Sequence, residues 1–266
     1  MPIEQPATAV ASLSSFVSTV KDMSRAWARE QRTPKVTPWF RGQGSADWDL
    51  KPKLYRLKDV DEDELRIDFE RFGVQMTKRA LDGDWNWYFL MQHYGTPTRL
   101  LDWTDSALVA LYFAVRDTGT GASPKASPAK GSDAAVWMME PGSLNKQVIG
   151  SDIILLKESK EAKAYLPDTL SSKSLRTRHP VAIDPPHVDI RLAVQRSHFT
   201  IHGTVKKGLE RVARKRKSRF KLAKLIIASG SVGAIREDLE TCGISEVTVF
   251  PDLEGLSREL THTWTG

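Results

Sequence analysis

The chain of 266 residues has a single cysteine, Cys242, and no long apolar run. One cysteine cannot form an internal disulfide, and such usage is typical of a reducing compartment. No stretch approaches the roughly 20 consecutive apolar residues of a membrane helix. The N-terminal segment MPIEQPATAVASLSSF lacks the basic start and apolar block of a signal peptide. The sequence therefore predicts a cytoplasmic protein without a membrane partner.

Several familiar catalytic and metal signatures are absent as well. The chain has no GxxxxGK[ST] phosphate loop, no GxGxxG, no HExxH and no CxxC pair. With six scattered histidines and one cysteine, a structural zinc site is not expected. His198 and His202 are four residues apart, a spacing that suits a metal on a helix, but they fall in a strand-like run. We therefore expect ordinary, partly buried histidines and no metal.

Composition and hydrophobic periodicity predict one globular α+β domain over 1–266. Hydrophobic residues make up 40% of the chain and charged residues 27%, which is ordinary for a folded protein. Apolar residues at helical spacing predict an N-terminal helix from Val10 to Trp27, capped by Thr8 or Ser12. Further helices are expected near 61–76, 85–92, 105–115 and 232–241, and after Pro251.

Short apolar and β-branched runs predict the strands of a mixed central sheet with flanking helices. These runs are VTPWFRG, AAVWMM, RLAVQ with HFTIHG, KLIIA and EVTVF. Because helices and strands do not alternate as regular βαβ units, α+β is favoured over a doubly wound sheet. The segment HYGTPTRLLDWT is interpreted as a structured loop, and 151–186 is too weakly patterned to predict any element.

Two segments have unusual compositions. Residues 119–133 are small, polar and proline-bearing, which predicts a mobile surface loop. Residues 205–224 contain ten basic residues against one acid, Glu210, so this segment carries +9 while the rest of the chain sums to −3. Such a patch attracts polyanions without specifying which one. The candidate nucleic-acid contacts in it are Lys206, Lys207, Arg211, Arg214, Lys215, Arg216, Lys217 and Arg219.

The first candidate site segment is Trp39-Phe40-Arg41-Gly42-Gln43. If the aromatic side chains are buried in a strand, Arg41 projects from the strand end into a partly apolar setting, where its five donors need an anionic or carbonyl partner. Gly42 allows a ligand or a second backbone to approach closely. The alternative interpretation is that Arg41 forms an internal salt bridge, for which Asp102 is a candidate partner.

The second candidate segment runs from Gln92 to Thr104 and concentrates groups that bind, stack or transfer protons. Loops of this density, fixed by Pro and Gly, are common places for binding sites. The alternative is structural, with Asp102 capping the helix that begins near Asp105 and Arg99 paired with Asp102. The candidate residues of this segment are His93, Tyr94, Arg99, Asp102, Trp103 and Thr104.

These motifs resemble a known family. WFRGQ, then KLYR, then QHYGTPTRLLDWTDSALVALYFA are similar to the FRG domain, named for its Phe/Tyr-Arg-Gly motif, and PDLEGL resembles the ending of that family. The resemblance spans Trp39 to Leu256. It implies a bacterial protein associated with mobile elements and phage defence, with a partner protein of the same defence system, and it does not by itself supply a reaction.

A second similarity is to ADP-ribosyltransferases, in the order aromatic-Arg-Gly on an early strand, then a hydroxyl-bearing strand end before an alanine-rich helix. This resemblance implies that Arg41 binds the phosphates or ribose of NAD, that Thr104 to Ala107 match the hydroxyl-bearing segment, and that Tyr94 or Trp103 stacks on nicotinamide. Those enzymes also carry a late catalytic glutamate, where this chain offers Gln195, which cannot act as a carboxylate base. Either Asp102 takes that role, the activity is altered, or NAD is bound without transfer.

Three functions follow from these residues. The first is an NAD-dependent ADP-ribosyltransferase of a defence or toxin system, with Asp102, Arg41 and Gln195 as catalytic candidates. Its pocket is expected to be built from Arg41, Gly42, Gln43, His93, Tyr94, Arg99, Trp103 and Thr104. The second is a module that binds RNA or DNA through the basic segment without catalysis. The third is a protein-interaction domain in which Arg41 and Asp102 are an internal ion pair.

Overall fold

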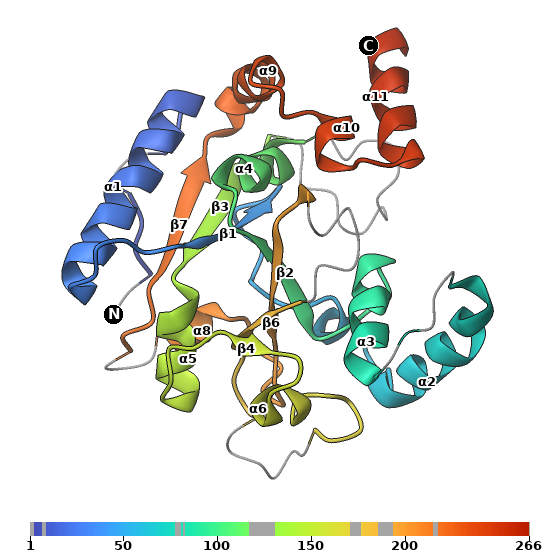
Figure 1. Cartoon of the computed structure of the whole chain (residues 1–266). Helices are drawn as coiled ribbons and strands as arrows, with labels where there is room; N and C mark the ends of the chain where they lie inside the picture. The colour runs from blue at the N-terminus through green and yellow to red at the C-terminus, as the bar shows by residue number, and fades with distance from the viewer. Residues whose placement is uncertain are drawn as a thin grey trace.

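A seven-stranded mixed sheet with helices on both faces forms the centre of the molecule (Figure 1). The computed structural model describes residues 3–6, 9–77, 81, 83–116, 131–170, 177–185, 194–214 and 218–265. The strand order is β4-β5-β6-β2-β1-β3-β7. All pairs are antiparallel except β4 and β5, which are parallel. This arrangement confirms the α+β class predicted from the sequence.

The strands are short and their pairing is uneven. β1 pairs with β3 over five residues but with β2 at one position only, Phe40 opposite Thr104. The two central strands therefore diverge beyond this pair. The strand bounds are β1 Trp39–Gln43, β2 Leu100–Thr104, β3 Ala134–Met139, β4 Leu155–Leu156, β5 Val181–Asp184, β6 Ser197–Ile201 and β7 Leu222–Ile227.

The helices follow the expected caps and spacings at most positions. Ser12 caps the first helix and forms a capping box with Ser15, as one of the two predicted caps. No described helix has the length and apolar character needed to cross a membrane. The α-helices are α1 Leu13–Gln31, α2 Glu62–Gly73, α3 Asp84–His93, α4 Ala107–Val115, α5 Pro141–Ile149, α6 Lys160–Lys163, α8 Glu210–Ala213, α9 Val232–Thr241, α10 Glu246–Val249 and α11 Leu253–Thr265. The 3-10 turns are η1 Leu54–Arg56, η2 Val74–Met76 and η4 Ser229–Ser231.

Two predictions of secondary structure were wrong. EVTVF forms α10 instead of a strand, because Ser245 and Thr248 make a capping box and the Glu246 carboxylate is bonded from α4 and α11. The end of HYGTPTRLLDWT, expected as loop, is the central strand β2, which pairs with β6 over five residues. The weakly patterned segment 151–186 contributes β4, α6 and β5. Of RLAVQ, residues 191–193 lie outside the described part, as do 119–130 of the predicted mobile loop and 215–217 of the basic segment.

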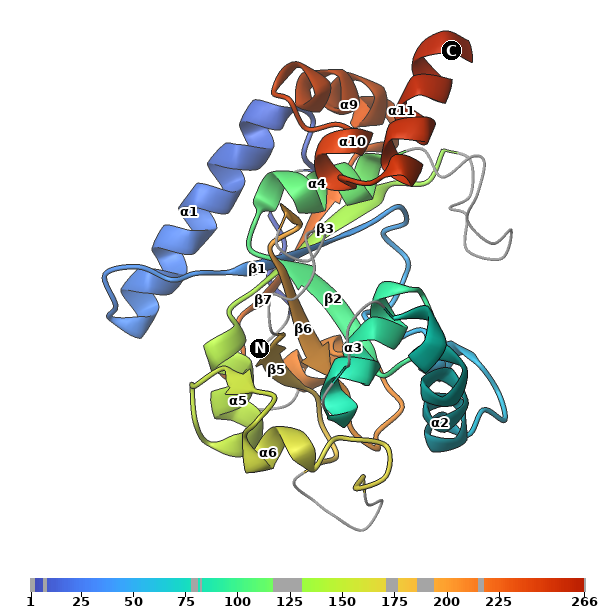
Figure 2. The same cartoon turned by 45° about the vertical axis from the view of Figure 1, so that its right-hand side comes forward.

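Three apolar clusters pack on the two faces of the sheet. The face that carries Phe40 and Val136 is covered by α1, α4 and α9, and its continuation on β2, β5 and β6 by α3 and α6. The opposite face carries Trp39, Trp103 and Trp137 and is covered by α5 and α8. Figure 2 shows α4 and α9 grouped above the strands and α3 with α2 beside them. On the first face, a gap therefore separates two sets of helices.

Candidate functional site

A cavity of about 830 Å³ lies in this gap, at the point where β1 and β2 diverge. Its walls come from segments far apart in the chain, which the sheet brings together. They are residues 40–44 of β1 and the following turn, 102–104 of β2, 92–93 at the end of α3, 113–116 of α4, and Gln195 and Ser197 at the start of β6. The two candidate segments predicted from the sequence thus meet at one cavity.

Arg41 reaches across the divergence between the two strands. Its Nη1 donates to the backbone oxygen of Asp102 at 2.8 Å and lies 3.5 Å from the Asp102 carboxylate. Its Nε is buried and has no hydrogen-bond partner within the described residues. Burial lowers the pKa of Arg41, the Asp102 charge opposes this, and the nearby Arg56 charge adds to the lowering. Arg41 therefore makes the internal contact that the alternative predicted, and its side chain also lines the cavity.

Asp102 is held by a chain of side-chain hydrogen bonds and remains half exposed. The Nε2 of Gln92 donates to both carboxylate oxygens at 2.9 Å, and the hydroxyl of Thr98 donates to the Gln92 Oε1. This second bond fixes the orientation of the amide. Within the described lining of the cavity, Asp102 is the sole carboxylate. Its carboxylate is therefore oriented toward the cavity and has room to accept a further donor.

Asp102 does not cap α4, and it does not pair with Arg99. The cap of α4 is Ser106, whose hydroxyl accepts from Val109 N. Arg99 is buried, with 2% of its surface exposed, and it donates to the Glu62 carboxylate and to the backbone oxygens of His202 and Tyr165. Arg99 lies outside the cavity lining, and its guanidinium has internal partners. Its role is therefore to connect segments in the interior of the fold.

Three further candidates reach the cavity in different ways. Gly42 lies under α4, where an added Cβ would be 2.0 Å from the Ala110 oxygen, so the close approach is that of a second backbone. Gln43 is buried, and its amide bonds to the Asp49 oxygen and the Trp137 indole. His93 lines the cavity.

The residues predicted to act on nicotinamide are separated by the sheet. Trp103 contributes to the lining, but its indole lies on the opposite face and donates to Thr200 at 3.1 Å. Tyr94 is 71% exposed and lies outside the lining. Thr104 lines the cavity and donates to the backbone oxygen of Gln195, whose own amide donates to Val249 O. The rings of Trp103 and Tyr94, the two residues predicted to stack on nicotinamide, are therefore not turned toward the cavity.

The sequence predicted a site on the segments Trp39 to Arg56 and Gln92 to Arg116, but it did not single out several cationic and aromatic residues of the lining as individual site candidates. They include Trp48, Arg56, Arg116 and Arg236. Arg56 donates to Lys51 O, Arg116 pairs with Glu246 at 3.3 Å, and Arg236 donates to Val115 O. With Arg41, four guanidinium groups line the cavity against one carboxylate. The signal for Arg56 was its place in KLYR, whereas Arg116 and Arg236 gave no local signal.

No group of three or more His, Cys, Asp or Glu side chains able to hold a metal occurs in the described part of the chain. His202 is buried and its pKa is lowered to about 3, chiefly by burial and further by Arg99 and Arg41. His198 is stacked on Trp39 with ring centroids 4.3 Å apart and bonds to Asp184 at 2.6 Å. The two histidines four residues apart are thus used inside the fold.

Comparison with protein families gives one match. Residues 37–122 match the model of the FRG domain. The match includes β1, η1, β2 and α4, the elements that hold Arg41 and Asp102, and it does not extend to the PDLEGL segment. Comparison with curated proteins and with solved structures found no match.

Proposed function

We propose that the cavity binds an anionic nucleotide, NAD, and that the protein transfers ADP-ribose to a macromolecular target. The observation that carries this proposal is the buried, unpartnered Nε of Arg41 at the cavity wall. A buried donor without a partner costs about 1–3 kcal/mol. A bound phosphate oxygen would remove that cost, and the proximity of Arg56 adds a second positive charge.

The size and charge of the cavity fit a dinucleotide. Ligand pockets typically enclose about 300–1,000 Å³, and this cavity has about 830 Å³. Guanidinium forks match phosphate oxygens in geometry and charge. Trp48, Phe113 and Phe199 supply apolar lining for a base or a ribose face. These features favour a phosphate-bearing, partly aromatic ligand over a neutral one.

In this function Asp102 takes the role that the late glutamate has in the similar transferases. When bound, NAD supplies a ribose carbon that is attacked by the acceptor as nicotinamide leaves. Asp102 would accept a hydrogen bond from a ribose or acceptor hydroxyl and place its negative charge close to the positive charge that develops at the ribose carbon. Gln92 and Thr98 hold the carboxylate in place, and Arg41 holds the phosphates. As the acceptor forms its bond to the ribose carbon, the bond from that carbon to nicotinamide breaks, and the acceptor passes one proton to the Asp102 carboxylate.

The similarity to FRG domains also supports a biological context. We propose that the protein is a bacterial effector of a phage-defence or toxin-type system, working with a partner protein of that system. A cavity with a preformed cationic wall and a single oriented carboxylate suits an effector whose reaction consumes or transfers a common metabolite. We therefore expect expression of the protein in cells to be toxic, and this toxicity to be lost when either Arg41 or Asp102 is replaced.

Binding can be tested by thermal stability with NAD, ADP-ribose and adenosine. We expect NAD and ADP-ribose to raise the melting temperature and adenosine, which lacks phosphate, to have little effect. Arg41→Gln should abolish the shift, while Arg25→Gln, an exposed arginine on α1, is the matched control. Failure of both phosphate-bearing ligands to stabilise the wild type would contradict the proposal.

Transfer is tested separately, with labelled NAD and a bacterial lysate. We expect label on a macromolecule with the wild type and none with Asp102→Asn, provided that Asp102→Asn still binds NAD. Binding without labelling by the wild type would reduce the function to NAD recognition.

A further inference from the structure

The mouth of the cavity is attached directly to the basic segment. The turn that carries Trp48 and Arg56 contacts residues 203–210 at both of its ends. Leu50 N donates to Glu210 Oε2 at 3.2 Å, and Leu209 N donates to Leu50 O at 2.9 Å. At the other end, the hydroxyl of Tyr55 donates to Gly203 O. These bonds place Arg56 and the start of the basic segment on one connected piece of structure.

The single acid of the basic segment is turned inward. Glu210 is buried, its carboxylate accepts from Leu50 N, and burial raises its pKa. Lys206, Lys207, Arg211 and Arg214 are exposed, and none of them forms an ion pair with an acid in the described part of the chain. The charge of Arg214 acts on the nearby Glu210 and lowers its pKa against the effect of burial, and the side chains of all four residues are exposed to solvent.

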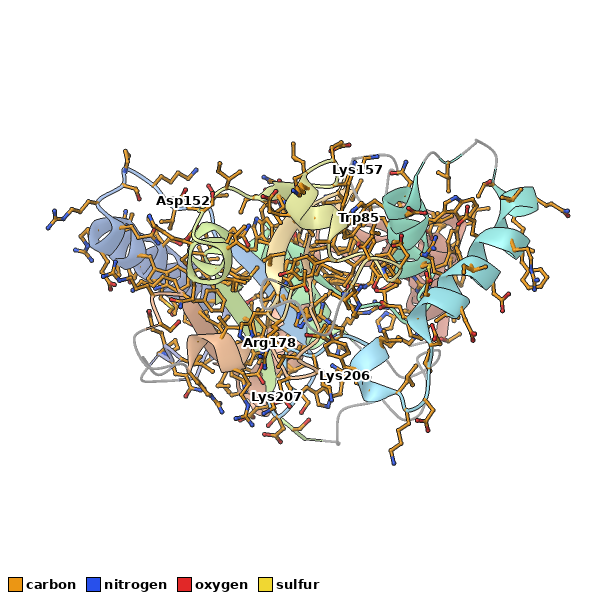
Figure 3. The ribbon with its side chains drawn as sticks, turned by 90° about the horizontal axis from the view of Figure 1, so that it is seen from below. Trp85, Asp152, Lys157, Arg178, Lys206 and Lys207 are labelled. Carbon is orange, nitrogen blue, oxygen red and sulfur yellow. The ribbon has the colours of Figure 1, made fainter. Side chains whose placement is uncertain are left out.

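A further arginine joins this surface from a distant segment. Val205 N donates to Arg178 O at 3.1 Å, and Thr204 N donates to Thr177 O at 3.0 Å. The exposed Arg178 thus lies beside Lys206 and Lys207, and Figure 3 shows these three residues together on one side of the molecule, away from Lys157, Trp85 and Asp152. The resulting basic band consists of Arg56, Arg178, Lys206, Lys207, Arg211 and Arg214.

We propose that the basic band binds a single-stranded nucleic acid and guides it to the cavity, and that this strand is the acceptor in the proposed transfer. A row of exposed cations for which no ion pair is found among the described residues suits a phosphodiester backbone. Trp48, partly exposed at the cavity mouth, offers a stacking surface for the base nearest the cavity. Burial lowers the pKa of Arg56 and the charge of Asp49 opposes this, so Asp49 is the acid that a phosphate would have to displace there.

The identification of the strand as acceptor rests on the proposed function, whereas the binding itself does not. Binding is measured with the full chain and fluorescent single-stranded RNA and DNA of equal length, duplex DNA, and poly-glutamate as the acidic-protein alternative. The band variant carries Lys206→Gln, Lys207→Gln, Arg211→Gln and Arg214→Gln. The control variant carries Lys21→Gln, Arg25→Gln, Arg29→Gln and Lys35→Gln, which remove the same charge from exposed positions in and just after α1.

We expect single strands to bind the wild type and the control variant, and to bind the band variant at least tenfold more weakly. The slope of log affinity against log salt should fall by about 3 for four lost phosphate contacts. Adding Arg178→Gln should weaken binding further. Equal loss in both variants, or tighter binding of poly-glutamate than of either nucleic acid, would overturn the proposal.

Separate readouts distinguish this proposal from the proposed function. Arg41→Gln should lose stabilisation by NAD and keep strand binding, and the band variant should show the reverse. If the wild type labels protein but never the bound strand, the strand is not the acceptor, even though NAD binding stands. A photocrosslinker on the base nearest the cavity should attach to residues 48–56, and attachment only outside both these residues and the basic band would contradict the path to the cavity.

Discussion

Replacing Gly42 with alanine should strongly destabilise the protein, because helix α4 lies directly on this residue. A Cβ built on Gly42 would be 2.0 Å from Ala110 O, 2.6 Å from Ala114 N and 2.9 Å from Phe113 C. Ordinary contacts need about 3.5–4.0 Å. All three atoms belong to backbone, which cannot rotate aside as a side chain can. The helix and the strand would have to separate by more than an ångström.

That separation disturbs the apolar cluster between α4, α1 and α9. Overpacking costs about 1–3 kcal/mol where side chains can yield, so we expect at least about 3 kcal/mol here. For a chain of this size, each kcal/mol lowers the melting temperature by about 2–4 °C. Gly42→Ala should therefore melt about 6–12 °C or more below the wild type. A calorimetric or fluorescence melt measures the shift.

Gly230→Ala is the matched control for this prediction. Gly230 has no atom within 4 Å of an added Cβ, and alanine there should leave the melting temperature almost unchanged. If Gly42→Ala melted within about 2 °C of the wild type, the close approach of α4 to β1 would be refuted. The cavity wall formed by Ala110 to Arg116 would then have to lie further from the sheet.

Two further predictions concern buried charge in the interior. Arg99→Leu should destabilise the protein by about 3–5 kcal/mol in urea unfolding, because the largely buried Glu62 loses its partner; Arg71→Leu, an exposed arginine, should cost well under 1 kcal/mol. His202 is neutral when folded because its pKa is lowered to about 3 from 6.5, so the unfolded chain binds the extra proton between these values. Stability should fall by about 1.4 kcal/mol per pH unit from this group as pH drops below 6.5, and His202→Gln should flatten that part of the urea-unfolding pH profile.

The hydrophobic pattern of a segment predicted its secondary structure correctly where long-range contacts favour the same structure as the local pattern. VTPWFRG was predicted as a strand, and its last four residues lie in β1, which extends to Gln43; the helix predicted over 232–241 has the same bounds as α9. Both segments show a clear hydrophobic pattern that tertiary contacts reinforce. EVTVF shows an equally clear strand pattern, yet Glu246 is bound by Tyr112 and Arg116, more than a hundred residues earlier. Such a long-range contact leaves no trace in the local pattern.

The assignment of Arg99 illustrates a related limit at the site. Its nearness to Asp102 in sequence suggested an ion pair, but side chains three apart on a strand point to opposite faces. Recognition of residues 100–104 as a strand would have excluded the pair. The contact between Arg41 and Asp102 was proposed correctly as one alternative, because both lie on central segments. Its coexistence with a cavity depends on the pairing of β1 with β2, which the sequence does not reveal.

That pairing explains why a cavity exists at Arg41. After Phe40 and Thr104, β1 continues along β3 while β2 continues along β6, so backbone groups facing the gap lose their ladder partners. Arg41 Nη1 supplies a donor to Asp102 O, where an adjacent strand would have supplied a backbone N–H. The guanidinium connects β1 to β2 only at Asp102, through Nη1, and its Nε is left without a partner within the described residues. In the proposed function, a phosphate oxygen that reaches this Nε would complete the hydrogen-bond pattern that the two diverging strands leave open.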